Sequence, residues 1–78
     1  MTNLEKLKKA FIDGIGANAE ELNDGFGYGS GAWDSVAHMK LIAAIETEFD
    51  IMIDTEDVID MNSFGKAREI LTKYDVVA

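Results

Sequence analysis

The apolar residues between positions 35 and 50 recur at the spacing of an α-helix, and this pattern limits the possible folds more than any other feature of the chain. At about 100° per residue, one sector of the helical wheel about 100° wide contains four apolar side chains, those of Leu41, Ile42, Ile45 and Phe49. Such a stripe is typical of a helix that packs one face on a core. Asp34 or Ser35 places an oxygen at its start, where it can satisfy backbone amides. The pattern predicts a helix over residues 35–50.

A second apolar stripe predicts another helix over residues 3–15. Its members follow the spacings that place side chains on one face of a helix, and they are Leu4, Leu7, Phe11, Ile12 and Ile15. Thr2 or Asn3 can cap the start of this helix. Gly14 and Gly16 offer permissive backbone for its end.

Two shorter helices are predicted in the C-terminal third. Acidic side chains suit the positive end of a helix, so the acid-rich segment 54–57 is expected to begin a short helix that runs to about Asp60. Asn62 or Ser63 then caps a fourth helix, whose inner face carries Phe64, Ala67, Ile70, Leu71 and Tyr74. The 78 residues suffice for one domain. We therefore expect an all-α fold, a single domain over residues 1–78 built as a small four-helix bundle with a short third helix.

The segment between the first two helices, residues 17–33, shows no helical periodicity. Glycine recurs at every second position from Gly25 to Gly31, and no continuous apolar face forms. Loops of this length are uncommon in compact domains unless they are functional or fixed to the body of the protein. We therefore expect a long loop that is docked onto the bundle by four large side chains, Leu22, Phe26, Tyr28 and Trp33.

The acidic balance of the chain bears on its partners. Fifteen acidic against seven basic residues give a formal net charge of −8, a field that repels nucleic acids and anionic lipids but attracts basic patches on proteins. No stretch approaches the roughly 20 apolar residues that span a bilayer, and the first residues lack the pattern of a secretory signal. The absence of cysteine fits a reducing compartment. We expect a cytoplasmic monomer with no nucleic-acid partner and no membrane insertion.

The helix over residues 35–50 carries a second, narrower apolar stripe, formed by Val36, Met39 and Ala43. It begins about 60° further round the wheel than the first, and the polar side chains among or beside it are Lys40, Glu46, Thr47 and Asp50. An apolar patch with charged neighbours has the form of a protein docking surface. The same apolar side chains would also suit packing against the glycine-rich loop, so both interpretations remain open at this point.

The usual combinations of catalytic and metal-binding residues are missing. A single histidine, His38, without cysteine cannot form a common zinc site, and the helical wheel places it on the core side as a packing residue. Neither Ser30 nor Ser35 lies in a Gly-x-Ser-x-Gly motif. The acids between Asp50 and Asp60 lack the spacing and the glycine of a calcium loop. We expect a protein that is not an enzyme and has no metal site.

The segment from Trp33 to Ile51, WDSVAHMKLIAAIETEFDI, resembles the signature of acyl carrier proteins, in which Asp-Ser-Leu precedes an amphipathic helix that ends in Glu-Phe-Asp. The resemblance implies a bundle of the acyl-carrier type in which Ser35, between Asp34 and Val36, carries covalent 4′-phosphopantetheine. A separate phosphopantetheinyl transferase would attach this group from coenzyme A with magnesium. The protein would then carry acyl or aminoacyl groups as thioesters from a loading enzyme to a downstream synthase.

The resemblance also implies a partner surface and a cavity. In the family, acidic side chains of the second and third helices meet basic patches on enzymes, and the matching residues here are Asp34, Glu46, Glu48, Asp50, Glu56 and Asp57. Val36 and Met39 would line the base of the arm. The family's bundle opens between these helices to admit an acyl group, and the candidate cavity residues are Phe49, Ile53, Ile59 and Leu71. Crowding by Phe11 or Phe64 would instead keep the cavity closed.

Three positions depart from the family's common pattern. Val36 replaces a leucine, Lys40 stands in the partner surface where fatty-acid carriers commonly have glutamate, and Trp33 replaces a small residue. A reversed charge can exclude standard partners. These departures favour a specialised pathway, such as polyketide, nonribosomal peptide, modified-lipid or polysaccharide synthesis, over general fatty-acid synthesis. The alternative is a helical adaptor that binds proteins and is never modified.

Overall fold

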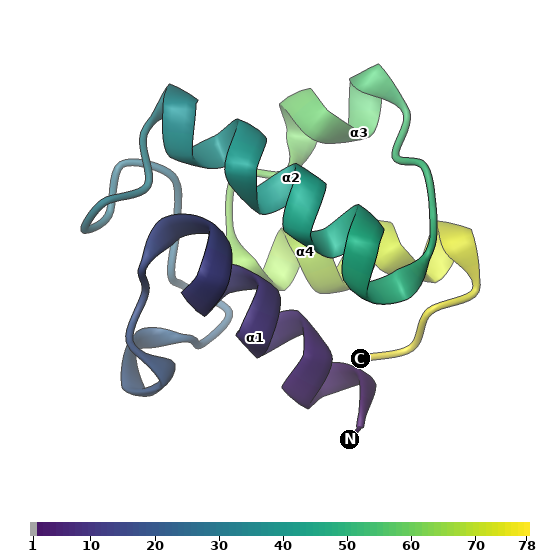
Figure 1. Cartoon of the computed structure of the whole chain (residues 1–78), viewed down its shortest axis with the longest axis horizontal. Helices are drawn as coiled ribbons and strands as arrows, with labels where there is room; N and C mark the ends of the chain where they lie inside the picture. The colour runs from purple at the N-terminus through teal and green to yellow at the C-terminus, as the bar shows by residue number, and fades with distance from the viewer. Residues whose placement is uncertain (1) are drawn as a thin grey trace.

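Four α-helices form the part of the chain that the computed structural model describes, residues 2–78, and they confirm the predicted all-α bundle. They are α1 (Asn3–Ile15), α2 (Ser35–Phe49), α3 (Thr55–Asp60) and α4 (Phe64–Leu71). Two 3₁₀ turns lie at Ala19–Glu21 and Thr72–Tyr74. In Figure 1, α1 and α2 run side by side in opposite directions, the short α3 lies next to α2 on the side away from α1, and the N- and C-termini end close together.

Side-chain oxygens cap three of the helices, because the first amides of a helix have no partner within it. Thr2 forms a capping box with Glu5 at the start of α1. Asp34 Oδ1 accepts from the amide of Ala37 at 2.8 Å, so Asp34 rather than Ser35 caps α2. At α4, Ser63 Oγ accepts from the amide of Lys66 at 2.9 Å. One residue of each pair of candidates named from the sequence therefore provides the cap.

Gly14 of α1 lies against the backbone of α2. A Cβ atom at this position would lie 2.7 Å from Leu41 Cα and 3.0 Å from Leu41 N. The expectation that Gly14 provides backbone freedom is therefore wrong, because its role is to let two helix backbones come together. Gly16 does end α1 as expected, with a left-handed φ of 69°.

A cluster of aromatic rings fills the centre of the bundle. The ring of Phe11 meets Phe64 and Trp33 edge to face, with centroids 4.9 and 5.3 Å apart. Phe26 stacks on Trp33 at 5.7 Å. All four rings are buried, and rings in such arrangements contribute somewhat more than their buried area alone.

The glycine-rich loop is fixed to the bundle by backbone hydrogen bonds as well as by side chains. The amide of Tyr28 donates to the carbonyl of Asn62 at 2.8 Å, and the amide of Phe64 donates to the carbonyl of Phe26 at 2.7 Å. The predicted docking of Leu22, Phe26 and Trp33 is confirmed, since all three are buried. The prediction for Tyr28 is wrong in part: its side chain is 52% exposed and lies at the rim of a pocket.

The carboxylate of Asp57 is buried at the start of α3, although the sequence suggested an exposed acid that meets partners. Asp57 accepts a hydrogen bond from Lys73 Nζ and another from the hydroxyl of Tyr74, both at 2.7 Å. The bond from Lys73, followed by that from Tyr74, lowers the pKa of Asp57, and the same contact raises the pKa of Lys73. Asp57 therefore holds α3 to the C-terminal turn and is withdrawn from the predicted partner surface.

Replacement of Asp57 with asparagine should make the stability of the protein less dependent on pH in the acidic range. The folded pKa of Asp57 lies below its ordinary value of 3.8, so the ionised carboxylate stabilises the fold above that pH and loses its effect as the pH falls through the folded pKa. Urea unfolding should therefore show Asp57→Asn to be less stable than wild type at about pH 7, with a smaller difference at about pH 3. Asp60→Asn, an exposed acid on the same helix, is the matched control. An identical pH dependence in wild type and Asp57→Asn would contradict this assignment.

Candidate functional site

Ser35 is the first residue of α2, and its side chain is exposed. Helix geometry leaves the first amides of α2 without partners inside the helix, and the aligned peptide dipoles make this end partly positive. Asp34 satisfies the amide of Ala37 and so fixes the helix start without using the hydroxyl of Ser35. The Ser35 hydroxyl is therefore placed at a helix N-terminus, accessible from outside and not needed as a cap.

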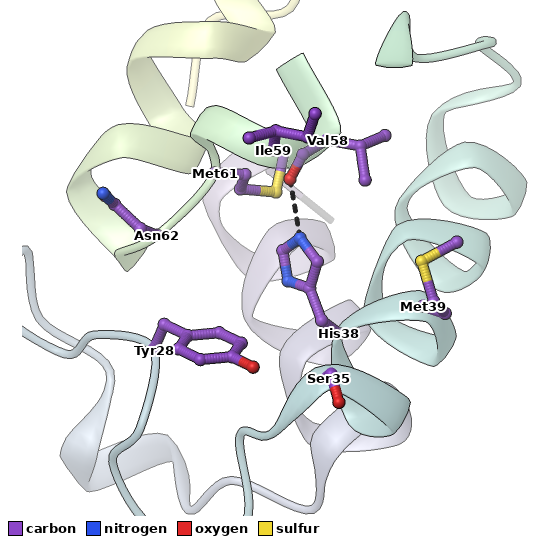
Figure 2. Close-up of a pocket in the computed structure, with 8 residues that line it drawn as sticks. All are labelled: Tyr28, Ser35, His38, Met39, Val58, Ile59, Met61 and Asn62. Atoms are coloured by element: carbon purple, nitrogen blue, oxygen red, sulfur yellow. Dashed lines mark hydrogen bonds between the residues drawn. The ribbon is translucent and has the colours of Figure 1, made fainter. Parts of the chain in front are cut away.

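A pocket of about 390 Å³ lies next to Ser35, between the start of α2, the end of α3 and the glycine-rich loop. Figure 2 shows the eight residues that line it: Tyr28, Ser35, His38, Met39, Val58, Ile59, Met61 and Asn62. Tyr28 comes from the loop, and residues 35, 38 and 39 come from successive turns of α2. The pocket thus brings together segments that are far apart in the sequence, and most of its lining is apolar.

His38 connects α2 to α3 at this pocket. Its Nδ1 lies 3.0 Å from Trp33 Nε1, and its Nε2 lies 2.7 Å from the carbonyl oxygen of Val58, the contact drawn as a dashed line in Figure 2. The indole nitrogen can only donate, so Nδ1 must accept, and Nε2 must carry the proton that it donates to Val58. Both ring nitrogens of His38 are therefore hydrogen-bonded, one to Trp33 and one to Val58. Its predicted partial burial is confirmed.

The second apolar stripe of α2 faces solvent. Val36 and Met39 are 66% and 59% exposed, and Lys40 and Ala43 are exposed as well. The alternative that this stripe packs against the glycine-rich loop is therefore excluded for these side chains. Ile59 of α3, which is 74% exposed, extends the apolar surface across the mouth of the pocket. A patch of exposed apolar side chains is a common mark of an interaction site.

The acidic residues predicted to meet partners do not form one continuous face. Glu46 accepts from the amide of Ile53 at 2.9 Å and so supports the connection from α2 to α3. Glu48 points from α2 towards α1, where its carboxylate forms an ion pair with Lys9 at 3.6 Å. Of the predicted set, three acids are exposed on α2, on α3 or at their boundaries, namely Asp34, Asp50 and Glu56.

The candidate cavity residues are also divided. Leu71 is fully buried in the core, and Phe49 and Ile53 are partly buried against it. Ile59 does not face the core, because it is exposed on α3 and lines the pocket beside Ser35. Met61 belongs both to the core and to the pocket lining, so the pocket beside Ser35 borders the core.

Sequence reasoning missed four residues of the pocket, namely Tyr28, Val58, Met61 and Asn62. Only Tyr28 carried a recognisable signal, since a large aromatic side chain among alternating glycines is unusual. Val58, Met61 and Asn62 join the pocket because the loop lies against the end of α3, where the amide of Tyr28 donates a hydrogen bond to the carbonyl of Asn62. Such a long-range pairing leaves no local pattern.

The described residues show no group of three or more histidine, cysteine, aspartate or glutamate side chains placed to hold a metal ion. Nor does any helix within residues 2–78 combine the length and the apolar character that a membrane span requires. No protein-family model matches the chain, and no curated protein matches it significantly.

Proposed function

We propose that this protein is an acyl carrier protein whose Ser35 bears 4′-phosphopantetheine. The observation that carries the proposal is the exposed hydroxyl of Ser35 at the N-terminus of α2, beside an apolar pocket and inside the segment that resembles the carrier signature. The residues present fit the group, since a helix N-terminus favours a phosphodiester and Asp34 already provides the cap. The protein would act by carrying its cargo, with no catalytic role of its own.

In the attachment reaction a phosphopantetheine group is transferred from coenzyme A to the protein. The protein contributes only the serine oxygen that receives this group. Ser35 Oγ forms a bond to the phosphorus of the phosphopantetheine part of coenzyme A, and the bond from that phosphorus to the bridging pyrophosphate oxygen breaks. Adenosine 3′,5′-bisphosphate leaves, and the hydroxyl proton passes to a base of the transferase or to solvent. The bound arm supplies the thiol that forms a thioester with the cargo. The magnesium for this transfer would be bound by the transferase.

Partner enzymes would approach from the exposed side of α2 and α3. Val36, Met39 and Ile59 offer apolar contact around the base of the arm. Asp34 and Glu56 are exposed at the starts of α2 and α3, and the net charge of −8 would speed encounter with basic surfaces. Lys40, exposed on the same helix, places a positive charge within this face and would select partners that lack a basic residue opposite it.

Ser35→Ala should abolish modification completely. Wild-type protein incubated with coenzyme A, magnesium and a broad-specificity transferase should gain one phosphopantetheine by intact mass. Ser35→Ala should gain none, while its circular dichroism stays unchanged because Asp34 caps α2. Ser30→Ala, an exposed serine in the glycine-rich loop, is the matched control and should be modified as wild type is. If wild type gains no mass with several transferases, the unmodified adaptor becomes the better account of the exposed surface.

A further inference from the structure

We infer that Lys40 is an acyl acceptor, whose side-chain amine takes the acyl group from the thioester carried by the same molecule and becomes a neutral Nε-acyl-lysine. This inference rests on the proposed function, because the acyl group reaches Lys40 only on an arm attached to Ser35. It adds a second covalent site to the chain, one that receives the cargo instead of the arm. The reaction also changes the charge of the surface on which partners would dock.

Lys40 differs from the other lysines in being both exposed and unpaired. The chain has six lysines, and all of them belong to the part that the structure describes. Ion pairs with carboxylates at 2.7 to 3.8 Å occupy the amines of three of them, Lys9, Lys66 and Lys73. Two others, Lys6 and Lys8, are partly buried on α1. Within residues 2–78, Lys40 is therefore the one lysine that is exposed and has no ion pair.

Lys40 is also the only lysine on the helix that begins with Ser35. It follows Ser35 by five positions, so at about 1.5 Å per residue it lies roughly 7.5 Å further along the axis of α2. The arm has a chain of about 14 bonds between Oγ and its sulfur, about as many as five peptide residues, which span up to about 17 Å when extended. The thioester therefore reaches the amine of Lys40 without full extension of the arm.

The lysines of α1 lie further from the arm. Figure 1 shows that α1 and α2 run in opposite directions, and Gly14 at the end of α1 packs against Leu41 in the first half of α2. Lys9 therefore lies beside the far end of α2, where it pairs with Glu48. Distance thus adds to accessibility in favouring Lys40 over these lysines.

A groove of about 380 Å³ next to Lys40 gives the reaction room. It lies between the end of α1 and the start of α2, and its lining includes Ile15, Val36, Ala37 and Lys40. The groove and the apolar pocket beside Ser35 share no lining residue, so they are separate sites. The apolar side chains of the groove offer contact to an acyl group that becomes attached to Lys40, and burial of apolar surface favours it there.

The proposed transfer conserves atoms and electrons. The lone pair of the uncharged Lys40 Nζ forms a bond to the carbonyl carbon of the thioester, and the bond from that carbon to sulfur breaks. The sulfur leaves with its electron pair and takes up the proton that Nζ loses, so an amide and a free thiol remain. No further reactant is required. Covalent attachment to Ser35 holds the thioester near this amine at a high effective concentration.

Acylation of Lys40 would change the surface that partners meet. The positive charge of Lys40 is the feature that would select partners without a basic residue opposite it. Acylation removes this charge and makes the net charge of −8 one unit more negative. A carrier whose cargo is not collected in time would thus pass to a form with a free thiol and an altered partner surface.

Peptide mapping of the loaded carrier tests the inference. Wild-type protein is loaded with acetyl-phosphopantetheine by a broad-specificity transferase, its loading is checked by intact mass, and it is then incubated at mildly alkaline pH. Fragments from a protease that cleaves after acidic residues should show acetyl accumulating on Lys40 at least about tenfold faster than on any other lysine. The intact mass should stay constant while one free thiol appears, whereas hydrolysis would remove one acetyl group from the mass.

Two conservative variants and a mixing experiment provide the controls. Lys40→Arg keeps the positive charge but offers no acceptor amine, so its acetyl group should stay on the arm until it is hydrolysed. Lys9→Arg changes the exposed lysine of α1 and should behave as wild type. Isotopically labelled Ser35→Ala, mixed with loaded wild type, should gain no acetyl on Lys40, because the transfer occurs within one molecule.

Three results would overturn the inference: acetyl spread evenly over the lysines, transfer to the labelled Ser35→Ala protein as fast as within the loaded protein, or hydrolysis that leaves Lys40 unmodified. Failure of the transferase to load wild type would bear on the proposed function instead. In that case Ser35→Cys, which introduces a single thiol into the chain, is alkylated with a haloacetamide arm of equal length that ends in an acetyl thioester. An unmodified Lys40 in that protein would count against the inference as well.

Discussion

Trp33→Ala should destabilise the fold by about 3–5 kcal/mol, the usual cost of truncating a large buried aromatic side chain. The indole is 1% exposed and contacts Phe11, Phe26 and His38. A small domain has only about 5–15 kcal/mol of total stability, so the variant should be partly or wholly unfolded at moderate urea concentrations. Urea unfolding followed by circular dichroism measures the loss. A variant as stable as wild type would show that the aromatic cluster does not hold the bundle together.

Trp33→Phe separates the two roles of the indole. A single aromatic ring is kept, but the five-membered part of the indole is lost with Nε1 and its hydrogen bond to His38 Nδ1, which leaves a partly buried acceptor without a partner. The expected loss is about 1–3 kcal/mol, smaller than that of Trp33→Ala. Tyr28→Ala, which removes a half-exposed ring from the same cluster, should cost less than Trp33→Ala and serves as the control for general loss of aromatic surface.

Gly14→Ala should destabilise the protein by about 1–3 kcal/mol, the usual cost of forcing extra volume into a well-packed contact. Helix propensity alone predicts the opposite, since alanine is favoured over glycine inside a helix by roughly 1 kcal/mol. The added Cβ would lie 2.7 Å from Leu41 Cα, and a backbone atom cannot move aside as a side chain end can. The steric term therefore outweighs propensity, and α1 must shift away from α2.

The same unfolding measurement decides between propensity and packing at this position. Asp13→Ala changes the neighbouring, exposed residue of α1 and should alter stability by no more than about 0.5 kcal/mol. A gain in stability in Gly14→Ala would contradict the close approach of Gly14 to Leu41 and show that α1 and α2 lie further apart.

Local patterns in the sequence were enough to predict the helices and much of the core. The stripe of Leu41, Ile42 and Ile45 is buried because a period of 3.6 residues allows one face of α2 to pack on α1. The same pattern offered Asp34 or Ser35 as the cap at the start of α2, and Asp34 provides it. These features depend on residues within a few positions of each other, which is why pattern alone could identify them.

The features that escaped prediction depend on residues far apart in the chain. The local sequence predicts that Asp57 is a solvated acid at a helix start. Only the folded chain brings Lys73 and Tyr74 within hydrogen-bonding distance of it. The contact of Gly14 with Leu41 and the pocket beside Ser35 likewise arise from the meeting of separate elements. Periodicity reports which face of a helix is apolar, but it does not report which neighbour covers that face.

Peptide mapping of the protein purified from the cells that express it tests the central claim most directly. Tandem mass spectrometry of its proteolytic fragments should find 4′-phosphopantetheine on the fragment that contains Ser35, with the mass located on that serine. An unmodified Ser35 in cells whose other carriers bear the arm, or an arm on any other residue, would contradict the account.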